Sequence, residues 1–264
     1  MGSATRGALA GTRAALADLG RAELQVAEDL LAAGRVIGSS SHLRSALIDS
    51  EADVAQKRTL IEAVFASKIT ADAVTLLTAA ASRRWSNGDD FVAGIEDLGY
   101  RVAAESAPAG VDLDAELFAF ERAVASDAEL ELALGSKLSP LPSKLALVDR
   151  LIDGKATPQT VAIVRHLVEQ PRGRRIGELL RHAAAVVADQ RGFDVATVTT
   201  AVPLTAAQLS RLEQGIVAQA GRRVRFDTIV DPAVIGGVRV QIGDDVIDGS
   251  VASKLDNARR RIAG

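Results

Sequence analysis

Apolar side chains recur at intervals of three and four residues through the first hundred positions, which is the spacing of one face of an α-helix. The first such run, residues 3–19, includes Leu9 and Leu16 but is otherwise rich in alanine, so its buried face is expected to be shallow. Further runs follow, most of them preceded by Ser, Thr, Asp or Asn residues suited to helix capping. Because the last run ends at Pro108, we predict an N-terminal bundle of six helices over residues 1–109.

The pattern then repeats at an offset of 87 residues. Without a gap, identical side chains coincide at Leu30 and Leu117, Ala32 and Ala119, Arg35 and Arg122, Leu43 and Leu130, Lys57 and Lys144, and Thr70 and Thr157. Apolar positions and helix breaks stay in phase along the offset segment, which is hard to obtain by chance even in an alanine- and leucine-rich chain. We predict a second, bundle-like helical repeat over residues 110–191.

The second repeat is expected to lack a counterpart of the first helix. The residues before Asp112 already belong to the final helix of the first bundle. A face that the first helix covers in the first repeat should therefore be open in the second, as a candidate docking surface, unless a neighbouring segment fills it.

From residue 192 onward the apolar period changes from that of a helix to the two-residue alternation of strands. Alternating runs occur over residues 195–199, 224–230, 238–242 and 246–247. Thr205 and Gln208 form a capping box for a helix between the first two runs, and Ser250 caps a closing helix. We predict a small α/β cap over residues 192–264, in the order β-α-β-β-β-α, and a mainly α fold overall.

Composition supports this fold class and excludes several functions. Of the 264 residues, 48% are hydrophobic but only 3% aromatic, which suits close-packed helices. The 31 Lys and Arg residues nearly balance 34 Asp and Glu residues, unlike a chain built to hold nucleic acid. Cysteine is absent, so disulfides, thiolate zinc sites and a cysteine nucleophile are excluded. We expect neither an export signal nor a membrane span, because no long uncharged stretch occurs.

Two charged clusters are candidate binding sites. Asp244, Asp245 and Asp248 could suggest a cation site, but their spacing does not fit a calcium loop and favours turn and capping duty. The basic segment from Pro171 to Arg175 could bind an anionic partner or be a solvated turn. The basic side chains near it are Arg165, His166, Arg181 and His182, and the two histidines, sixteen positions apart, are not predicted to bind a metal. We predict no catalytic, cofactor or metal residues.

The C-terminal region resembles a known family. The run from Val234 to Leu255 is similar, in order and spacing, to the C-terminal signature of the delta subunit of the F-type ATP synthase, the bacterial relative of the mitochondrial oligomycin-sensitivity-conferring protein. The signature residues here are Gly236, Gly237, Gly243, Asp244, Asp248, Gly249 and Ser250. The six N-terminal helices also resemble that family's bundle. The extra helical segment resembles the long delta subunits of high-GC Gram-positive bacteria.

The resemblance implies a non-catalytic stator subunit of the proton-translocating ATP synthase, on the cytoplasmic face of the cell membrane. It implies that the N-terminal bundle binds the N-terminal helices of the alpha subunits, that the C-terminal region binds the end of the membrane-anchored b subunit, and that membrane contact is only through the complex. By this analogy the alpha site lies on residues 3–19 and 70–85, with Leu9, Leu16, Val74 and Leu77 as lining positions.

Two other functions remain as alternatives. An enzyme would place a divalent cation at the three aspartates, Asp244, Asp245 and Asp248. A helical RNA-binding regulator or adaptor would use Arg172, Arg174 and Arg175, and its binding would depend steeply on salt. Which repeat contacts the catalytic head is not decided by the pattern.

Overall fold

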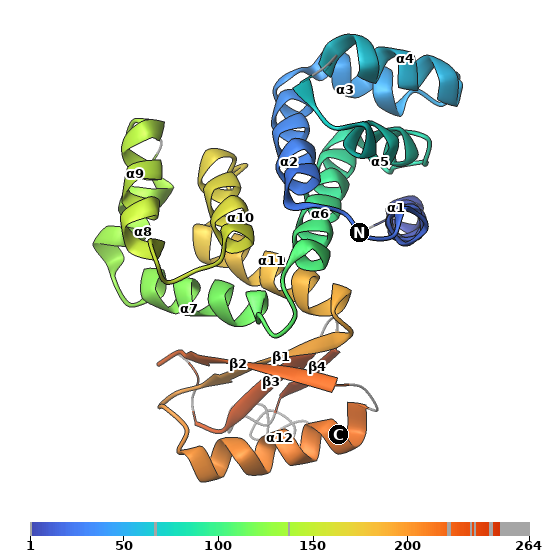
Figure 1. The fold of residues 1–264 in the computed structure, drawn as a ribbon. Helices are drawn as coiled ribbons and strands as arrows, with labels where there is room; N and C mark the ends of the chain where they lie inside the picture. Colours follow the sequence, from blue (N-terminus) through green and yellow to red (C-terminus); the bar gives the residue numbers. More distant parts are fainter. Residues whose placement is uncertain are drawn as a thin grey trace, which may run out of the picture. The chain divides into compact units, whose positions relative to one another are not determined.

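The computed structural model describes residues 2–65, 68–136, 138–220, 223–232, 234, 236–242 and 245–248, which form twelve helices and four strands (Figure 1). The mainly α fold with a small C-terminal α/β cap is confirmed. The chain divides into two compact units, Met1–Val187 and Ala188–Gly264. The division between a first and a second helical domain near residue 110 stays a prediction.

The first unit is built entirely from helices. They are α1 Ser3–Leu19, α2 Leu24–Ser39, α3 Ser41–Ile48, α4 Val54–Phe65, α5 Ala71–Ala81, α6 Gly88–Ser106, α7 Leu113–Ala125, α8 Ala128–Gly135, α9 Leu141–Ile152, α10 Pro158–Glu169 and α11 Ile176–Gln190, whose last residues belong to the second unit. Helix α6 is buried around most of its circumference between α2 and its other neighbours, so it forms the axis of this unit.

The offset of 87 residues is confirmed by the helix boundaries. Helices α8 and α9 begin and end 87 positions after α3 and α4, and α7 and α10 follow α2 and α5 with nearly the same ends. The caps repeat as well, because the side chains of Thr70 and Thr157 each accept a hydrogen bond from the backbone three residues later. Equal apolar spacing and equal caps have therefore produced the same supersecondary arrangement twice.

A tertiary hydrogen bond is also duplicated. The carboxylate of Asp29 on α2 accepts from the backbone N–H of Thr70 at 2.6 Å, and the carboxylate of Glu116 on α7 accepts from the backbone N–H of Thr157 at 2.9 Å. Both bonds satisfy a backbone donor at a helix N-terminus, where the helix itself provides no acceptor. Long-range polar contacts, and not only helix lengths, are shared by the two repeats.

The expectation that the second repeat lacks a counterpart of the first helix was wrong, and the face that would otherwise be open is filled by a neighbouring helix. Residues 3–19, offset by 87 positions, fall within α6. In the first repeat α1 packs against α5, and in the second α6 packs against α10, with α2 also in contact. Helix α6 is thus both the last helix of the first repeat and the first helix of the second. Reading the sequence in order assigned α6 to the first repeat alone. Because α6 is buried around most of its circumference, it packs against helices of both repeats.

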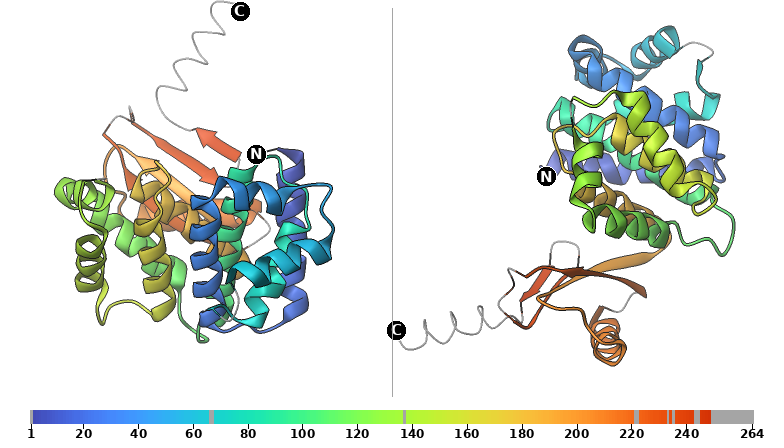
Figure 2. Two further views of the ribbon diagram at one scale, coloured as in Figure 1. Left: turned by 90° about the horizontal axis from the view of Figure 1, so that it is seen from above. Right: turned by 90° about the vertical axis from the view of Figure 1, so that its left-hand side faces the viewer.

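The second unit contains β1 Phe193–Thr200, α12 Ala206–Ala220, β2 Arg223–Val230, β3 Val238–Ile242 and β4 Asp245–Asp248. The sheet order is β2-β1-β3-β4, with β1 and β2 parallel and the other pairs antiparallel. Helix α12 lies along one face of the sheet (Figure 2), where Val198, Ile216 and Val240 form the buried core. The capping box is confirmed, since Thr205 N–H donates to Gln208 at 2.9 Å. The predicted closing helix after Ser250 lies outside the described residues.

Candidate docking faces and the charged junction between the repeats

The four predicted head-binding residues lie on two helices in mutual contact, α1 and α5. Their exposures differ. Leu16 and Leu77 are fully enclosed and Val74 is buried, whereas Leu9 is partly exposed. Leu16, Val74 and Leu77 therefore hold the helices of the first repeat together. Of the four, Leu9 has the side chain that an approaching partner can contact directly.

The N-terminal end of α1 is tied to the start of α6. The hydroxyl of Thr5 donates to the Asp90 carboxylate at 2.5 Å, lies 2.9 Å from the Ser86 hydroxyl, and accepts from the Ser86 backbone N–H at 3.3 Å. Thr5 is itself buried. The apolar face of α1 is formed mostly by small alanine side chains, as the sequence indicated. These polar bonds therefore help to hold α1 in position.

The two repeats meet at a charged cluster centred on the buried Glu96 of α6, which we term the Glu96 junction and define as Glu96, His166, Arg172 and Arg174. The Glu96 side chain is 4% exposed and pairs with Arg172 at 3.0 Å and Arg174 at 3.7 Å. His166 Nε2 lies 3.5 Å from Glu96 Oε1, which is long for a hydrogen bond, so the Arg172 pair is the firm contact. A buried carboxylate needs such partners because water does not reach it.

Burial by itself raises the pKa of Glu96. The polar neighbour His166 and the guanidinium charges of Arg172 and Arg174 act in the opposite direction and prevail, so the pKa of the Glu96 carboxyl lies below its ordinary value. The carboxylate is therefore ionised throughout the neutral range.

A second polar contact crosses the same junction from α2. The guanidinium of Arg35 donates to His166 Nδ1 at 3.1 Å and pairs with the Glu169 carboxylate at 2.8 Å. Because Nδ1 accepts this bond, the neutral His166 ring carries its proton on Nε2, the nitrogen that faces Glu96. The imidazole of His166 on α10 is thus bonded to α2 and lies 3.5 Å from Glu96 of α6.

The basic side chains that the sequence offered for an anionic partner are largely engaged inside the molecule. Arg172 pairs with Glu96 and also donates to the Asp89 carbonyl at 3.0 Å. Arg165 makes two 2.8 Å bonds to Asp149, and Arg181 makes a 2.6 Å bond to Glu121. Two of the three arginines of the RNA-binding alternative thereby serve the Glu96 junction, which weakens that interpretation.

The sequence pattern did not identify Glu96. The nearest signal was a run of charged residues, Glu96, Asp97 and Arg101, inside a helix that also contains a complete apolar stripe. Asp97 and Arg101 form a buried i,i+4 pair at 2.7 Å. The partners of Glu96 lie 70 or more positions away, with Arg172 separated from it by 76 residues. Periodicity within α6 cannot report a partner at that distance.

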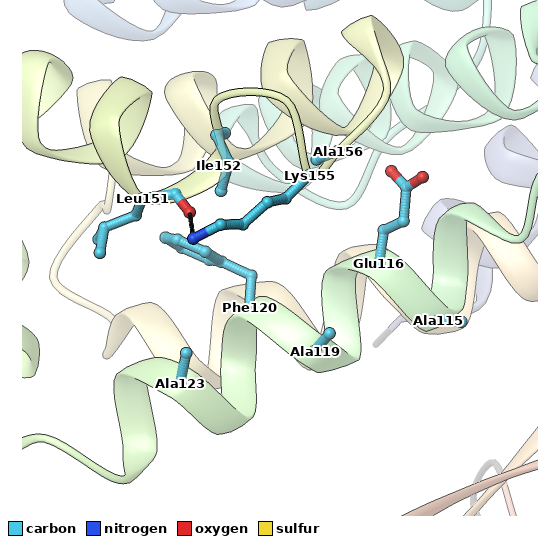
Figure 3. A pocket seen from close by; sticks show the side chains of 9 residues that line it. All are labelled: Ala115, Glu116, Ala119, Phe120, Ala123, Leu151, Ile152, Lys155 and Ala156. Carbon is cyan, nitrogen blue, oxygen red and sulfur yellow. Dashed lines mark hydrogen bonds between the residues drawn. The ribbon is translucent and has the colours of Figure 1, made fainter.

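An apolar groove lies in the second repeat between α7 and the end of α9 (Figure 3). It has a volume of about 470 Å³, with Phe120 and Ile152 among its lining residues. Its two ionisable side chains already have contacts: Glu116 accepts from Thr157 and Thr160, and Lys155 donates to a backbone carbonyl at 3.4 Å. The groove offers apolar surface rather than reactive groups.

The family signature lies in the second unit. Gly236 and Gly237 have φ values of 63° and 84°, in the left-handed region that glycine adopts without strain, so this glycine pair forms the turn into β3. Asp248 ends β4, opposite Arg239 of β3. Gly243, Asp244, Gly249 and Ser250 lie outside the described residues.

Neither a metal site nor a membrane span is found within the described part of the chain. No group of three or more His, Cys, Asp or Glu residues there could hold a metal ion. Over the same residues, no helix combines the length and apolar character needed to cross a bilayer. Asp244, one of the three aspartates of the cation-site alternative, lies outside the described residues.

A duplicated helical scaffold followed by a small α/β unit, with a buried carboxylate paired to Arg172 inside the scaffold, is typical of a subunit that binds other proteins. The chain belongs to the ATP synthase delta (OSCP) subunit family, whose model matches residues 100–262. It is accordingly a peripheral stalk component of ATP synthase and a non-catalytic one.

Full-length relatives agree with this assignment. The chain is 54% identical over 265 residues to ATP synthase subunit delta of Leifsonia xyli subsp. xyli, with 100% of both chains covered. It is 40% identical over 240 residues to that of Kineococcus radiotolerans, covering 90% of this chain and 87% of the relative. With Beutenbergia cavernae the identity is 38% over 253 residues, covering 94% and 93%. The long form of the subunit, expected from the extra repeat, is confirmed by these coverages.

The family model matches the second repeat and the α/β unit, and most of the first repeat lies outside the match. The match begins within α6 and runs through the second repeat into the α/β unit. The first hundred residues were expected to correspond to the family's bundle, whereas the family model matches the second repeat. The first repeat is represented in the full-length relatives instead.

Proposed function

We propose that this subunit joins the catalytic alpha and beta head of the ATP synthase to the membrane-anchored b subunit and resists the torque of the rotor during ATP synthesis. The helical unit would bind N-terminal helices of the alpha subunits, and the C-terminal unit would hold the end of b. The chain would lie at the cytoplasmic face of the cell membrane and contact the membrane only through the complex.

The observation that best supports this proposal is the joining of the two repeats through α6. A stator element must transmit force without internal slippage. Sharing one buried helix, pairing Arg35 of α2 with His166 of α10, and pairing Glu96 of α6 with Arg172 oppose sliding of one repeat on the other. Two flexibly tethered bundles would not have this property.

We place the alpha contact on the outer surface of α1 and α5. Leu16 and Leu77 are enclosed, so the proposed contact uses Leu9 and the exposed side chains beside it rather than all four predicted residues. Deleting α1 would be a poor test, because it would remove the buried Leu16 and unfold the first repeat. A point change at Leu9 avoids this.

The experiment is co-purification of the tagged full-length chain with the other synthase subunits. Leu9→Glu should reduce recovery of the alpha and beta subunits by about tenfold, because a carboxylate is placed in an apolar contact. The matched control is Val36→Glu on α2, whose side chain is 46% exposed and lies outside the proposed face. Equal recovery with both variants would remove the alpha contact from α1.

The b contact is tested in the second unit. Ile247 on β4 is 52% exposed, at an edge of the sheet. Ile247→Glu should reduce recovery of b and leave the alpha and beta subunits associated. Loss of all subunits together, or of none, would contradict the proposed division of partners between the two units.

A further inference from the structure

The apolar groove between α7 and the end of α9 is lined by small side chains that are particular to the second repeat (Figure 3). Three of them are Ala115, Ala123 and Ala156. At the offset of 87 residues the first repeat has a larger side chain in each place, namely Glu28, Val36 and Ile69. Because the helices of the first repeat form with those larger side chains, the fold of a repeat does not require alanine at these positions.

The walls of the groove are apolar and its size suits a small molecule. Phe120 is 6% exposed and Ile152 is 5% exposed, so both are anchored in the repeat. Ala119 lies between them on the exposed face of α7. The volume of about 470 Å³ falls within the range of about 300–1,000 Å³ that is typical of small-molecule sites. A hydrocarbon chain in the groove would leave water together with the walls that it covers.

The two ionisable side chains that line the groove differ in how firmly they are held. Oε2 of Glu116 accepts three hydrogen bonds at the start of α10, from the Thr157 N–H at 2.9 Å, the Thr157 hydroxyl at 2.9 Å and the Thr160 hydroxyl at 2.6 Å. Lys155 extends across the groove (Figure 3), and its ammonium donates to the Leu151 carbonyl at 3.4 Å, which is long for such a bond. A stronger acceptor can therefore replace this carbonyl.

We propose that this groove, termed the α7–α9 groove, binds a fatty carboxylate. The hydrocarbon chain lies between α7 and the end of α9, and the carboxylate pairs with the ammonium of Lys155. A carboxylate is a better acceptor for an ammonium than a neutral carbonyl, and the methylene stem of Lys155 adds to the apolar wall. The site uses none of the residues proposed for the stator contacts, so it does not rest on them.

Other small ligands fit the α7–α9 groove less well. A phosphate or nucleotide would bring charged oxygens against Phe120 and Ile152, with one ammonium to pair with them. An apolar cation would be repelled by Lys155 and would meet Glu116, whose charge is already offset by three donors. A fatty carboxylate satisfies both the apolar walls and the basic side chain.

The first experiment measures the binding of decanoate to the purified full-length chain by isothermal titration calorimetry, at low ionic strength and below the concentration at which decanoate forms micelles. We expect saturable binding at a single site. The neutral analogue 1-decanol reports the apolar contribution alone and should bind more weakly. No saturable binding of decanoate, or equal affinity for decanoate and 1-decanol, would overturn the proposal.

The role of the ammonium is tested with Lys155→Gln. This variant should weaken decanoate binding by about two- to fivefold, since the ion pair is partly open to solvent, and should leave 1-decanol within about twofold. The matched control is Lys68→Gln, which removes the exposed lysine at the equivalent place in the first repeat and should change neither affinity. Equal losses for decanoate and 1-decanol in Lys155→Gln would show an effect on structure and contradict the assignment.

The groove itself is tested with the graft Ala115→Glu, Ala123→Val, Ala156→Ile, which introduces the side chains of the first repeat. Decanoate binding should weaken by about tenfold or more, because the apolar space is filled. Should the graft fold poorly, Ala119→Leu alone enlarges an exposed helical position and should also weaken binding. The control Ala125→Leu lies on α7 outside the groove and should leave affinity unchanged. Unchanged affinity in both groove variants would refute the site.

Hydrocarbon chains are also present in membrane lipids, and cosedimentation with phosphatidylglycerol vesicles separates the two sources. Decanoate binding without cosedimentation would support a free fatty carboxylate as the ligand. Cosedimentation that Ala119→Leu abolishes, with no binding of decanoate, would assign the groove to a lipid and overturn the proposal. Because none of these variants changes Leu9 or Ile247, the outcome is independent of the co-purification experiments.

Discussion

The substitution Glu96→Gln tests whether the Glu96 junction holds the two repeats together. Glutamine keeps the size of the side chain and one acceptor oxygen but removes the charge opposite Arg172 and Arg174. A hydrogen bond to a charged group contributes about 1.5–3 kcal/mol, so we expect the free energy of unfolding of the helical unit to fall by about 2 kcal/mol. For a unit of this size the Tm should fall by about 4–8 °C.

The measurement is urea denaturation at pH 7 followed by circular dichroism. The control is Glu62→Gln, which removes a surface i,i+4 pair with Arg58 at 2.8 Å in which both side chains are 52% exposed. That pair should contribute no more than about 0.5 kcal/mol. A loss for Glu96→Gln no larger than that of the control would refute the role assigned to the junction.

The pH dependence of the same pair of proteins gives an independent check. The pKa of Glu96 is lower in the folded chain than in the unfolded chain, so its contribution is complete above the unfolded value and is lost as the pH falls through the folded one. The difference in stability between wild type and Glu96→Gln should therefore be constant from about pH 7 to 5 and shrink below about pH 4.3. A difference that grows on acidification would contradict the sign of the shift.

Other substitutions test the packing. Gly94→Ala should destabilise the helical unit by about 2 kcal/mol or more, because its Cβ would lie 2.0 Å from the buried indole of Trp85; Gly135→Ala, a helical site with no atom within 4 Å, should be neutral or slightly stabilising. Leu16→Ala should cost about 2–5 kcal/mol in chemical denaturation, since the side chain is 0% exposed. Gly237→Ala should destabilise the α/β unit by about 1–2 kcal/mol at its φ of 84°, measured as earlier loss of amide protection in β3.

Much of the fold follows from local patterns. Apolar periods of three to four residues, and caps such as Thr70 and Thr157, define helices from nearest-neighbour physics, and alternation defines β1 to β4 in the same way. The 87-residue offset is visible because both repeats need the same periods and caps. The glycine pair at Gly236 and Gly237 could likewise be read as a turn, since only its backbone conformation matters.

The tertiary structure alone decided which helix completes the second repeat and which side chains remain accessible. Periodicity shows that Leu9, Leu16 and Leu77 lie on apolar faces, but it cannot tell a face that another helix covers from one left open. Glu96 appears in the sequence as an ordinary helical carboxylate, and it becomes the centre of the junction only when residues more than 70 positions away fold against it. Local period is a property of neighbouring residues, whereas burial and charge pairing depend on contacts between distant ones, and those exist only in the folded chain.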